Sequence, residues 1–380
     1  MDPASAVAAV RQLPTGPAGG SLRSADGLGA PRLIEWIANP LRDPAFEPSE
    51  DDAAVSFHRE LDGYAPSALI EAPDLATEWR VGRVLLKFEE HRFCLPAFKF
   101  LGVSWAGQRL LGDPPHDADL RLVAATDGNH GRAVARLARI KGLKASILVP
   151  AGTAPARIDA IAGEGAEVDV IDGSYDDAIE RSAAMAGPRA LVLSDTSWPG
   201  YTDVPSWVID GYATIFAEID EQAGGRVDVA LVPIGVGALA AAAANHLAGR
   251  SRLVGVEPAD AACFLESARA GEITETPPPH GSIMAGLNCG LPSIVAWPPV
   301  RDGFELFCAI DDPVAVAGMK RLAALGLAAG ECSGGTAGAA AELMGDEAAR
   351  AELGVGDDST VLALLTEGIT NPDDYEKLIG

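Results

Sequence analysis

Residues 227–240 read VDVALVPIGVGALA, and they are the strongest indication of the fold class. Its first half, Val227–Pro233, is a near-continuous apolar run of the kind that predicts a strand buried on both faces. Gly235 and Gly237 follow the run, and an Ala-rich segment of helical length follows the glycines. Another short run, Arg252–Val256, then predicts a second strand. The order strand, glycine turn, helix, strand indicates a mainly parallel, doubly wound α/β sheet, in which ligands bind at the carboxyl ends of the strands.

The glycine loop, Gly235–Ala240, is compatible with three interpretations. It matches the G-x-G-x-x-A fingerprint of dinucleotide-binding proteins, and Glu257 supplies the acidic residue that this fingerprint carries downstream. Bare backbone N–H groups at a helix N-terminus would bind a single phosphate monoester equally well. The third interpretation is a tight strand-to-helix turn without a ligand. The loop alone leaves all three open.

The rest of the chain repeats the same rhythm. Helical stretches rich in Ala, Leu and Arg alternate with short β-branched runs, which predict further strands at Arg121–Ala125, Ala145–Val149, Glu167–Ile171 and Val361–Leu365. A length of 380 residues is enough for two domains. Residues 1–30 are rich in Ala, Gly, Pro and Ser and show no sustained period, so we expect a mobile N-terminal arm there.

Composition narrows the class of partner and the compartment. The chain has 54 Asp and Glu against 29 Lys and Arg, a formal charge of −25, which repels phosphate backbones and anionic lipid. We therefore expect no nucleic-acid and no membrane partner. The five cysteines contain no C-x-x-C pair, which argues against a zinc site and a disulfide framework, so we expect no metal. The N-terminus lacks the basic and apolar regions of a secretory signal, and we expect a cytoplasmic protein.

Lys99 lies between two phenylalanines in the segment 92–102, RFCLPAFKFLG. An apolar environment desolvates an ammonium group and lowers its pKa, which favours the neutral amine that forms a Schiff base. We therefore predict a lowered pKa and a nucleophilic amine at Lys99. The alternative is a lysine that runs its stem along an apolar surface and places its charge in water.

Two acidic side chains follow expected strands. Thr126–Gly131, TDGNHG, comes directly after the strand expected at Arg121–Ala125 and before a helix expected at Arg132–Ile140. In this loop Asn129 could hold a phenolic oxygen, and Asp127 could carry a proton or cap the helix. Asp195 follows the short apolar run Ala190–Leu193 in the same way, and on its own it predicts no more than a cap or turn.

Nine segments together resemble the diaminopropionate ammonia-lyases, a family of fold-type II pyridoxal-phosphate enzymes. They occur in the order seen in that family and cover most of the chain from about residue 30: 92–102, Thr126–Gly131, Asp172–Ala178, Asp195–Tyr201, Gly211–Thr214, Gly235–Ala240, Val256–Pro258, Ile283–Leu287 and Thr366–Gly368. Asp127 is a distinguishing residue, because dehydratases, synthases and racemases of this fold carry a hydroxyl residue at its position.

The resemblance implies a cofactor and a set of residues that hold it. Lys99 would form the internal aldimine with pyridoxal 5′-phosphate, and Asn129 would bond the ring hydroxyl oxygen. Thr366 would place a neutral hydroxyl beside the pyridine nitrogen, which then stays unprotonated and favours elimination. The phosphate would be held by Gly235, Val236, Gly237, Ala238 and Leu239.

The implied reaction is α,β-elimination of ammonia from D- or L-2,3-diaminopropionate, which yields pyruvate and ammonia through an aminoacrylate. Lys99 would remove the Cα proton of the L-isomer and Asp127 that of the D-isomer. Asp195 would lie near Asp127, and the repulsion between the two carboxylates would raise one pKa, so that one acid could hold a proton. All three residues are expected to be catalytic.

The resemblance also implies the architecture. A larger cofactor domain would comprise residues 31–106 and 213–380, and a smaller domain, residues 107–212, would be inserted into it. Each domain would contain a mainly parallel, twisted sheet flanked by helices. A homodimer and a small amino-acid substrate are expected on the same ground.

The sequence departs from the family at four places. Cys94 stands where the family usually has Gly, Pro96 where it has Asn, and Ala238 where it commonly has Ser, and the segment 332–335, CSGG, differs from the usual G-E-S-G. The changes at Cys94 and Cys332 are expected to affect pocket shape. They keep open a dehydratase or lyase acting on serine, threonine or another β-substituted amino acid. A nicotinamide-dependent oxidoreductase, resting on the glycine loop and Glu257, is the alternative from another class.

Overall fold

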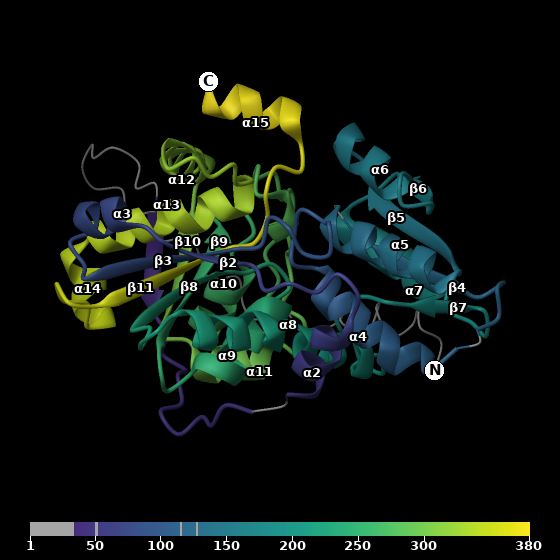
Figure 1. The fold of residues 1–380 in the computed structure, drawn as a ribbon, viewed down its shortest axis with the longest axis horizontal. Helices are drawn as coiled ribbons and strands as arrows, with labels where there is room; N and C mark the ends of the chain where they lie inside the picture. The colour runs from purple at the N-terminus through teal and green to yellow at the C-terminus, as the bar shows by residue number, and fades with distance from the viewer. Residues whose placement is uncertain (1–33, 50–51, 115, 127) are drawn as a thin grey trace.

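Two separate β-sheets, one of seven strands and one of four, form the frame of the molecule (Figure 1). The computed structural model describes residues 34–49, 52–114, 116–126 and 128–380. The expected arm, residues 1–30, lies outside the described residues, and so does Asp127. Among the described helices, none is both long and apolar enough to cross a bilayer.

The larger sheet is parallel in its centre and carries one antiparallel strand at each edge. Its carboxyl-terminal strand lies between two strands that come much earlier in the chain. In spatial order the strands are β1 (Ile34–Ala38), β10 (Leu306–Ile310), β9 (Arg252–Pro258), β8 (Val229–Pro233), β11 (Thr360–Leu365), β3 (Arg83–Phe88) and β2 (Ala68–Glu71).

Helices cover both faces of this sheet, and each face has its own apolar core. In Figure 1 one group lies above the sheet: α3 (Pro73–Glu78), α12 (Asp312–Ala324) and α13 (Glu331–Gly345). Helix α14 (Glu347–Leu353) lies at the left end of the sheet beside β11 and packs into the same core. The group below comprises α2 (Ala53–Glu60), α4 (Phe100–Leu111), α8 (Asp203–Gln222), α9 (Ala238–Leu247), α10 (Cys263–Ala270) and α11 (Trp297–Gly303). A 3₁₀ turn, Ala285–Leu287, and the terminal helix α15 (Pro372–Ile379), which buries no side chain, complete the set.

The smaller sheet is entirely parallel. Its spatial order is β6 (Glu167–Ile171), β5 (Lys144–Pro150), β4 (Arg121–Ala125) and β7 (Ala190–Val192). Its helices are α5 (Asn129–Lys141), α6 (Pro155–Ala162) and α7 (Tyr175–Ala184). One face packs on α7 around a small core of its own, whereas the other face shares a continuous core with α4 and α8.

The strands that the sequence predicts are all present, and the α/β fold class is confirmed. Arg121–Ala125 and Glu167–Ile171 match β4 and β6 residue for residue, and the others differ by at most two residues at an end. The helix expected at Arg132–Ile140 begins three residues earlier, at Asn129. Asn129 and His130 are therefore not loop residues but form the first turn of α5.

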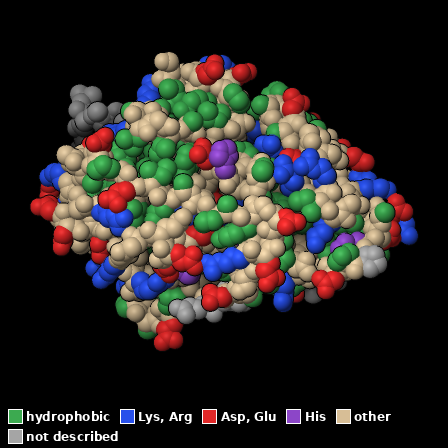
Figure 2. Space-filling model, viewed as in Figure 1, with side chains coloured by type: hydrophobic (Ala, Val, Ile, Leu, Met, Phe, Trp, Pro, Cys, Tyr) green, Lys and Arg blue, Asp and Glu red, His purple; other side chains and the backbone are tan. Residues whose placement is uncertain are grey.

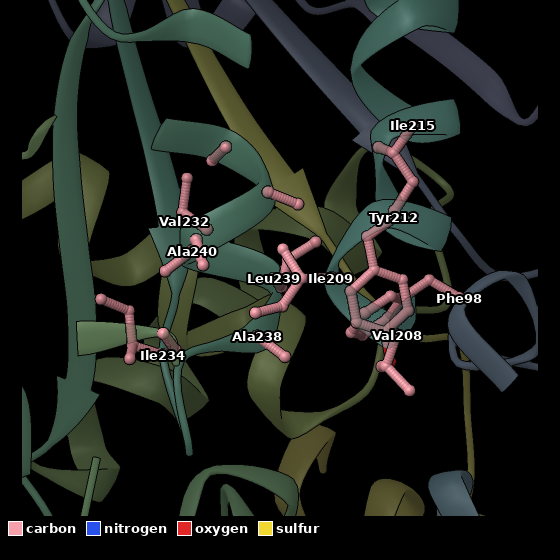
Figure 3. Packing of buried hydrophobic residues seen from close by; sticks show 14 of the residues in the cluster. Phe98, Val208, Ile209, Tyr212, Ile215, Val232, Ile234, Ala238, Leu239 and Ala240 are labelled. Carbon is pink, nitrogen blue, oxygen red and sulfur yellow. The ribbon is translucent and has the colours of Figure 1, made fainter. Parts of the chain in front are cut away.

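Two glycines allow α4 and α8 to meet at the junction between the sheets. A Cβ on Gly211 would lie 2.7 Å from Gly102 Cα, and a Cβ on Gly102 would lie 2.7 Å from the Tyr212 ring. Figure 3 shows that ring beside Phe98, and their centroids are 4.8 Å apart. The expected domain boundaries, residues 107 and 212, fall inside these two helices.

A buried ion cluster holds the connection between β3 and α4. Lys87 Nζ lies 2.7 Å from Glu218 Oε2, and Arg92 Nη1 lies 2.7 Å from Glu218 Oε1. Arg92 also pairs with Glu89 at 2.7 Å. All four side chains are at most 2% exposed. Through Glu218, the cluster attaches the segment that leads to Lys99 to helix α8.

The same connection contains a tight turn with unusual backbone angles. Arg92 and Leu95 exchange both backbone hydrogen bonds, at 2.9 and 3.0 Å. Phe93 and Cys94 between them have φ values of +53° and +61°, the type I′ pattern that normally takes Asn and Gly. Arg136 of α5 donates to the Phe93 carbonyl at 3.0 Å, which ties this turn to the smaller sheet.

Acidic side chains are spread over the surface. On the face drawn in Figure 2 the Asp and Glu side chains are interspersed with Lys and Arg. The charge of −25 is therefore not gathered into one patch on this face.

Candidate active site

A pocket opens where strands of both sheets end. Thr126 follows β4, the glycine loop follows β8 and Thr366 follows β11. Asp127, which the sequence predicts as a catalytic residue, lies outside the described residues, although its neighbour Gly128 lines the pocket. The other predicted site residues all line it: Lys99, Asn129, Asp195, Gly235, Val236, Gly237, Ala238, Leu239 and Thr366.

Lys99 is the residue immediately before α4, and its amine is already paired. Its Nζ donates to Asp195 Oδ2 at 2.8 Å and lies 5.2 Å from the centre of the Phe98 ring. Burial by itself lowers the pKa of Lys99, but the Asp195 carboxylate outweighs it, and the net pKa is raised. The predicted lowered pKa is therefore wrong for this state of the protein. The apolar flank was visible in the sequence, whereas the carboxylate comes from a segment 96 residues away.

Asp195 is buried and faces two nitrogen-bearing side chains. Lys99 lies on one side, and His130 Nδ1 lies 3.6 Å from the same oxygen, Oδ2. Burial raises the pKa of Asp195, but His130, when its ring is protonated, and the Lys99 ammonium lower it well below its usual range. Asp195 is thus a carboxylate here. Asp195 is therefore not the protonated acid of the expected pair in this arrangement.

The glycine loop forms a cradle at the N-terminus of α9. Gly237, the residue before the helix, has a φ of +98°, and a Cβ there would lie 2.2 Å from the Phe264 ring. A Cβ on Gly235 would lie 3.1 Å from the Gly286 carbonyl. Only glycine fits at Gly237, and a side chain at Gly235 would be tight, so the start of α9 presents its backbone N–H groups to the pocket. Such a cradle suits an anionic group such as a phosphate monoester.

Glu257 cannot serve the dinucleotide interpretation. Its side chain is fully buried and accepts backbone hydrogen bonds from Phe264 at 2.7 Å and Leu265 at 2.9 Å, in the first turn of α10. Burial raises the pKa of Glu257 to about 8, against the opposing effect of these two N–H groups. Glu257, the acidic residue of the dinucleotide fingerprint, thus caps α10 and does not line the pocket.

These residues fit pyridoxal phosphate. The cradle of Gly235 and Gly237 suits its phosphate, the Lys99 amine faces the same pocket, and Thr366 offers a neutral hydroxyl at the end of β11. The pocket also contains Arg157 and Glu367, so its lining carries both signs of charge, and the backbone cradle would hold the phosphate.

Comparisons with known proteins agree with this chemistry. Residues 60–367 match a family model described as pyridoxal-phosphate dependent enzyme. A diaminopropionate ammonia-lyase of Salmonella typhimurium is 33% identical over 371 residues, which are 86% of this chain and 90% of that protein. The corresponding Escherichia coli protein is 35% identical over 303 residues, which are 73% of this chain and 76% of its own length. The chain belongs to the diaminopropionate ammonia-lyase family.

A solved structure supports the same assignment. The Escherichia coli diaminopropionate ammonia-lyase, crystallised with an aminoacrylate-PLP azomethine reaction intermediate, superposes with a TM-score of 0.85 at 32% identity, covering 91% of this chain and 96% of that chain. The expected fold-type II class and the expected cofactor, pyridoxal 5′-phosphate, are confirmed. The protein is a pyridoxal-phosphate-dependent ammonia-lyase, and the nicotinamide alternative is excluded.

Within this ammonia-lyase pocket, Asn129 makes a contact that the sequence did not predict. Its Nδ2 donates to Glu367 Oε2 at 2.6 Å, and Glu367 Oε1 accepts from the Cys332 backbone N–H at 3.1 Å. Burial, with the nearby Glu367 charge, raises the pKa of Glu331 to about 7. Glu367 lies inside the segment Thr366–Gly368 that carries the resemblance, but its role was not predictable, because its partner Asn129 lies 238 residues away in the chain.

The departures from the ammonia-lyase pattern divide into two groups. Ala238 and Cys332 line the pocket. Cys94, which is exposed, and Pro96 are not among the described lining residues. The expectation that Cys94 affects pocket shape is therefore wrong, because it sits at the tip of the turn before Lys99. Burial raises the pKa of Cys332 well above its usual value, so this thiol behaves as a small apolar group.

Proposed function

We propose that this ammonia-lyase acts on 2,3-diaminopropionate and releases pyruvate and ammonia. One arrangement carries the proposal. The Lys99 amine and the Asp195 carboxylate are in contact in a pocket that also contains the glycine cradle at Gly235 and Gly237. An amine for the cofactor, a carboxylate beside it and a cradle for a phosphate are thus combined in one place.

The protein supplies binding and proton transfer, and bound pyridoxal phosphate supplies an electron sink for the charge left at Cα. Thr366 would meet the ring nitrogen with a neutral hydroxyl. Asn129 would orient the ring through its amide, which Glu367 already holds in place at 2.6 Å. These assignments are supported by the position of both residues in the pocket lining.

Proton removal at Cα is assigned to two residues. Lys99 would take the proton of the L-isomer, and Asp127 that of the D-isomer from the opposite side. Asp195 would hold the Lys99 ammonium as long as no cofactor is bound to Lys99. In the loaded enzyme it would instead bind the cationic β-ammonium group of the substrate. A correctly placed acid or base contributes about 10²–10⁴ in rate.

A substrate panel tests the proposal. The holoenzyme is supplied with D- and L-diaminopropionate, D- and L-serine and L-threonine, and both ammonia and pyruvate or 2-oxobutyrate are quantified. We expect one or both diaminopropionate enantiomers to give the highest kcat/KM. A higher kcat/KM for a hydroxy amino acid would instead establish the dehydratase alternative.

The assignment of Asp127 makes a separate prediction. Asp127→Asn removes the base for one enantiomer only, so turnover of the D-isomer should fall by about 10²-fold or more while turnover of the L-isomer changes much less. Steady-state kinetics on the two enantiomers measure this ratio. Equal losses on both would rule out a stereospecific role.

We propose in addition that the protein is a cytoplasmic homodimer. The family resemblance supports the dimer. The compartment is supported by the five cysteines, all within the described part of the chain, none of which forms a disulfide. Size-exclusion chromatography with light scattering determines the oligomeric state, and a monomer at working concentration would refute it.

A further inference from the structure

Lys99 presents a chemical difficulty. An amine must be neutral to attack an aldehyde, yet the Lys99 ammonium is held by Asp195 at 2.8 Å, which favours the protonated form. Some group must take this proton before the amine can react. The described residues around Asp195 contain one side chain with a nitrogen suited to receive it.

That side chain is His130, in the first turn of α5. Its Nε2 lies 2.9 Å from the Leu193 carbonyl oxygen, and because a carbonyl only accepts, Nε2 carries the hydrogen. Nδ1 of the neutral ring is therefore an acceptor. It has no hydrogen-bond partner among the described residues, it is buried, and it lies 3.6 Å from Asp195 Oδ2. A buried nitrogen without a partner beside a carboxylate requires a physical explanation.

We propose that His130 is a positioning residue that acts through Asp195 and stores the proton that Lys99 must lose. The N–H bond on Lys99 breaks as an O–H bond forms on Asp195 Oδ2, and that proton then passes to His130 Nδ1. Both steps are proton transfers, with no oxidation or reduction. The result is a neutral Lys99 amine, an Asp195 carboxylate and a His130 imidazolium with both nitrogens bonded. This inference rests on the proposed role of Lys99 in binding the cofactor.

Burial and the neighbouring charges together lower the pKa of His130, so its ring is neutral while Lys99 is still an ammonium. Burial lowers the pKa of His130, the Asp195 charge opposes burial, and the Lys99 charge lowers the pKa further. When Lys99 becomes neutral, the last of these effects disappears and the attraction of Asp195 remains. The separation of 3.6 Å is longer than a hydrogen bond, but such contacts commonly shorten when a site is loaded.

Other titratable groups face the same triad from three further elements. Tyr201, after β7, and Tyr212, on α8, both lie near Asp195, and burial raises the pKa of each. Cys289, in the loop before α11, lies near Lys99. Both phenols therefore stay protonated at neutral pH, and neither is suited to accept the proton.

The test measures how fast the full-length protein reloads its cofactor. The cofactor is removed, pyridoxal phosphate is added, and the rise of the visible absorbance of the bound cofactor is followed between about pH 6 and 9. In the wild type, His130 accepts the proton internally, so the loading rate should depend weakly on pH. In His130→Gln, which keeps a donor for the Leu193 carbonyl, Lys99 must lose its proton to solvent. We expect the rate near neutral pH to fall about a hundredfold and to rise about tenfold per pH unit.

A matched variant controls for the loss of a buried histidine. His58 is fully buried, and both of its ring nitrogens have partners, Thr214 and Leu101. His58→Gln should therefore keep the wild-type pH dependence. If His130→Gln also keeps the wild-type slope, whether at full rate or uniformly slower, the inference is overturned, because a purely structural role would act equally at every pH.

A second measurement does not depend on the stability of a variant. Imidazole ¹⁵N spectra of wild-type protein, which has six histidines, are recorded before and after loading, with His130 assigned from its contact with Leu193. We expect a neutral Nε2–H ring before loading and an imidazolium after it, and a ring that stays neutral overturns the inference. A protein that loads as described but releases no ammonia from diaminopropionate would refute the proposed substrate and leave the role of His130 intact.

Discussion

Single residues show where local sequence was informative and where it was not. Lys99, Asn129, Asp195 and Thr366 lie in one pocket, as the order of the motifs predicts. The charge states were not predictable, because each depends on a partner distant in the chain. His130 left no local signal, because it was expected in a loop and its contact Leu193 lies 63 residues away in the chain.

Glu257 gives a prediction about pH. Burial raises its pKa to about 8, from about 4.5 in an unfolded chain. Between these values the folded protein keeps a proton that the unfolded chain releases, so this group lowers stability as pH rises through that window. The glutamine of Glu257→Gln cannot titrate. We therefore expect the fall in unfolding free energy between about pH 5.5 and 8 to be smaller in this variant than in the wild type, by about 1–3 kcal/mol.

Urea unfolding at pH 5.5 and pH 8 measures the effect of Glu257→Gln. The control is Glu352→Gln, the same substitution at an exposed side chain of α14. An identical pH dependence in Glu257→Gln and the wild type would contradict the buried, protonated state of Glu257.

Cys94 is strained in a way that glycine would relieve. Its φ of +61° is unfavourable for any residue with a Cβ, and the family usually has glycine there. Cys94→Gly should raise the unfolding free energy by about 0.5–1 kcal/mol, because the relief of strain exceeds the added freedom of the unfolded chain. Cys94→Ala keeps the strain and should give no gain. Urea unfolding compares the two, and equal stabilities would contradict the argument.

At the scale of elements, the strands were predictable and the connections were not. Apolar runs such as Arg121–Ala125 mark buried strands directly. The start of α5 was placed too late because Asn129 and His130 are polar and resemble loop residues. The ion cluster of Lys87, Glu89, Arg92 and Glu218 left no local pattern, since Glu218 lies 126 residues after Arg92.

That cluster predicts a strong coupling between β3 and α8. Lys87→Met or Glu218→Gln leaves an uncompensated buried charge and should cost about 3–5 kcal/mol of unfolding free energy. The double variant removes both charges, so its cost should be less than the sum, with an interaction energy of about 1–3 kcal/mol. A double-mutant cycle by urea unfolding measures this energy, and simple additivity would show that the pair is not coupled.

At the scale of the whole molecule, the two sheets and their shared pocket follow from the order of motifs, but the strand order does not. The strands β4 to β7 pair with one another, while those before and after them pair in the larger sheet. The boundaries of the inserted domain remain a prediction, because α4 and α8 pass through the junction and contribute to one continuous core.

The charge of −25 predicts a dependence on salt. Repulsion among the excess carboxylates opposes the compact state, and salt screens it over a Debye length of about 10 Å at 0.1 M. The melting temperature should therefore rise by several degrees when potassium chloride is increased from about 10 to 150 mM. Differential scanning fluorimetry measures the shift. A fall would mean that the surface ion pairs, rather than the net charge, dominate.

The position of β11 has a consequence for how the chain folds during synthesis. The four-stranded sheet is built from residues 121–192 and can assemble while the ribosome is still translating the rest. The seven-stranded sheet cannot, because β11 enters between β8 and β3 only after residue 365 has emerged. Until then β8 and β3 have unpaired edges, which is the state most open to aggregation. The larger sheet therefore depends on its last strand. Termination a few codons before Thr360 would remove β11 and leave β3 and β2 without a pairing to the rest of the sheet.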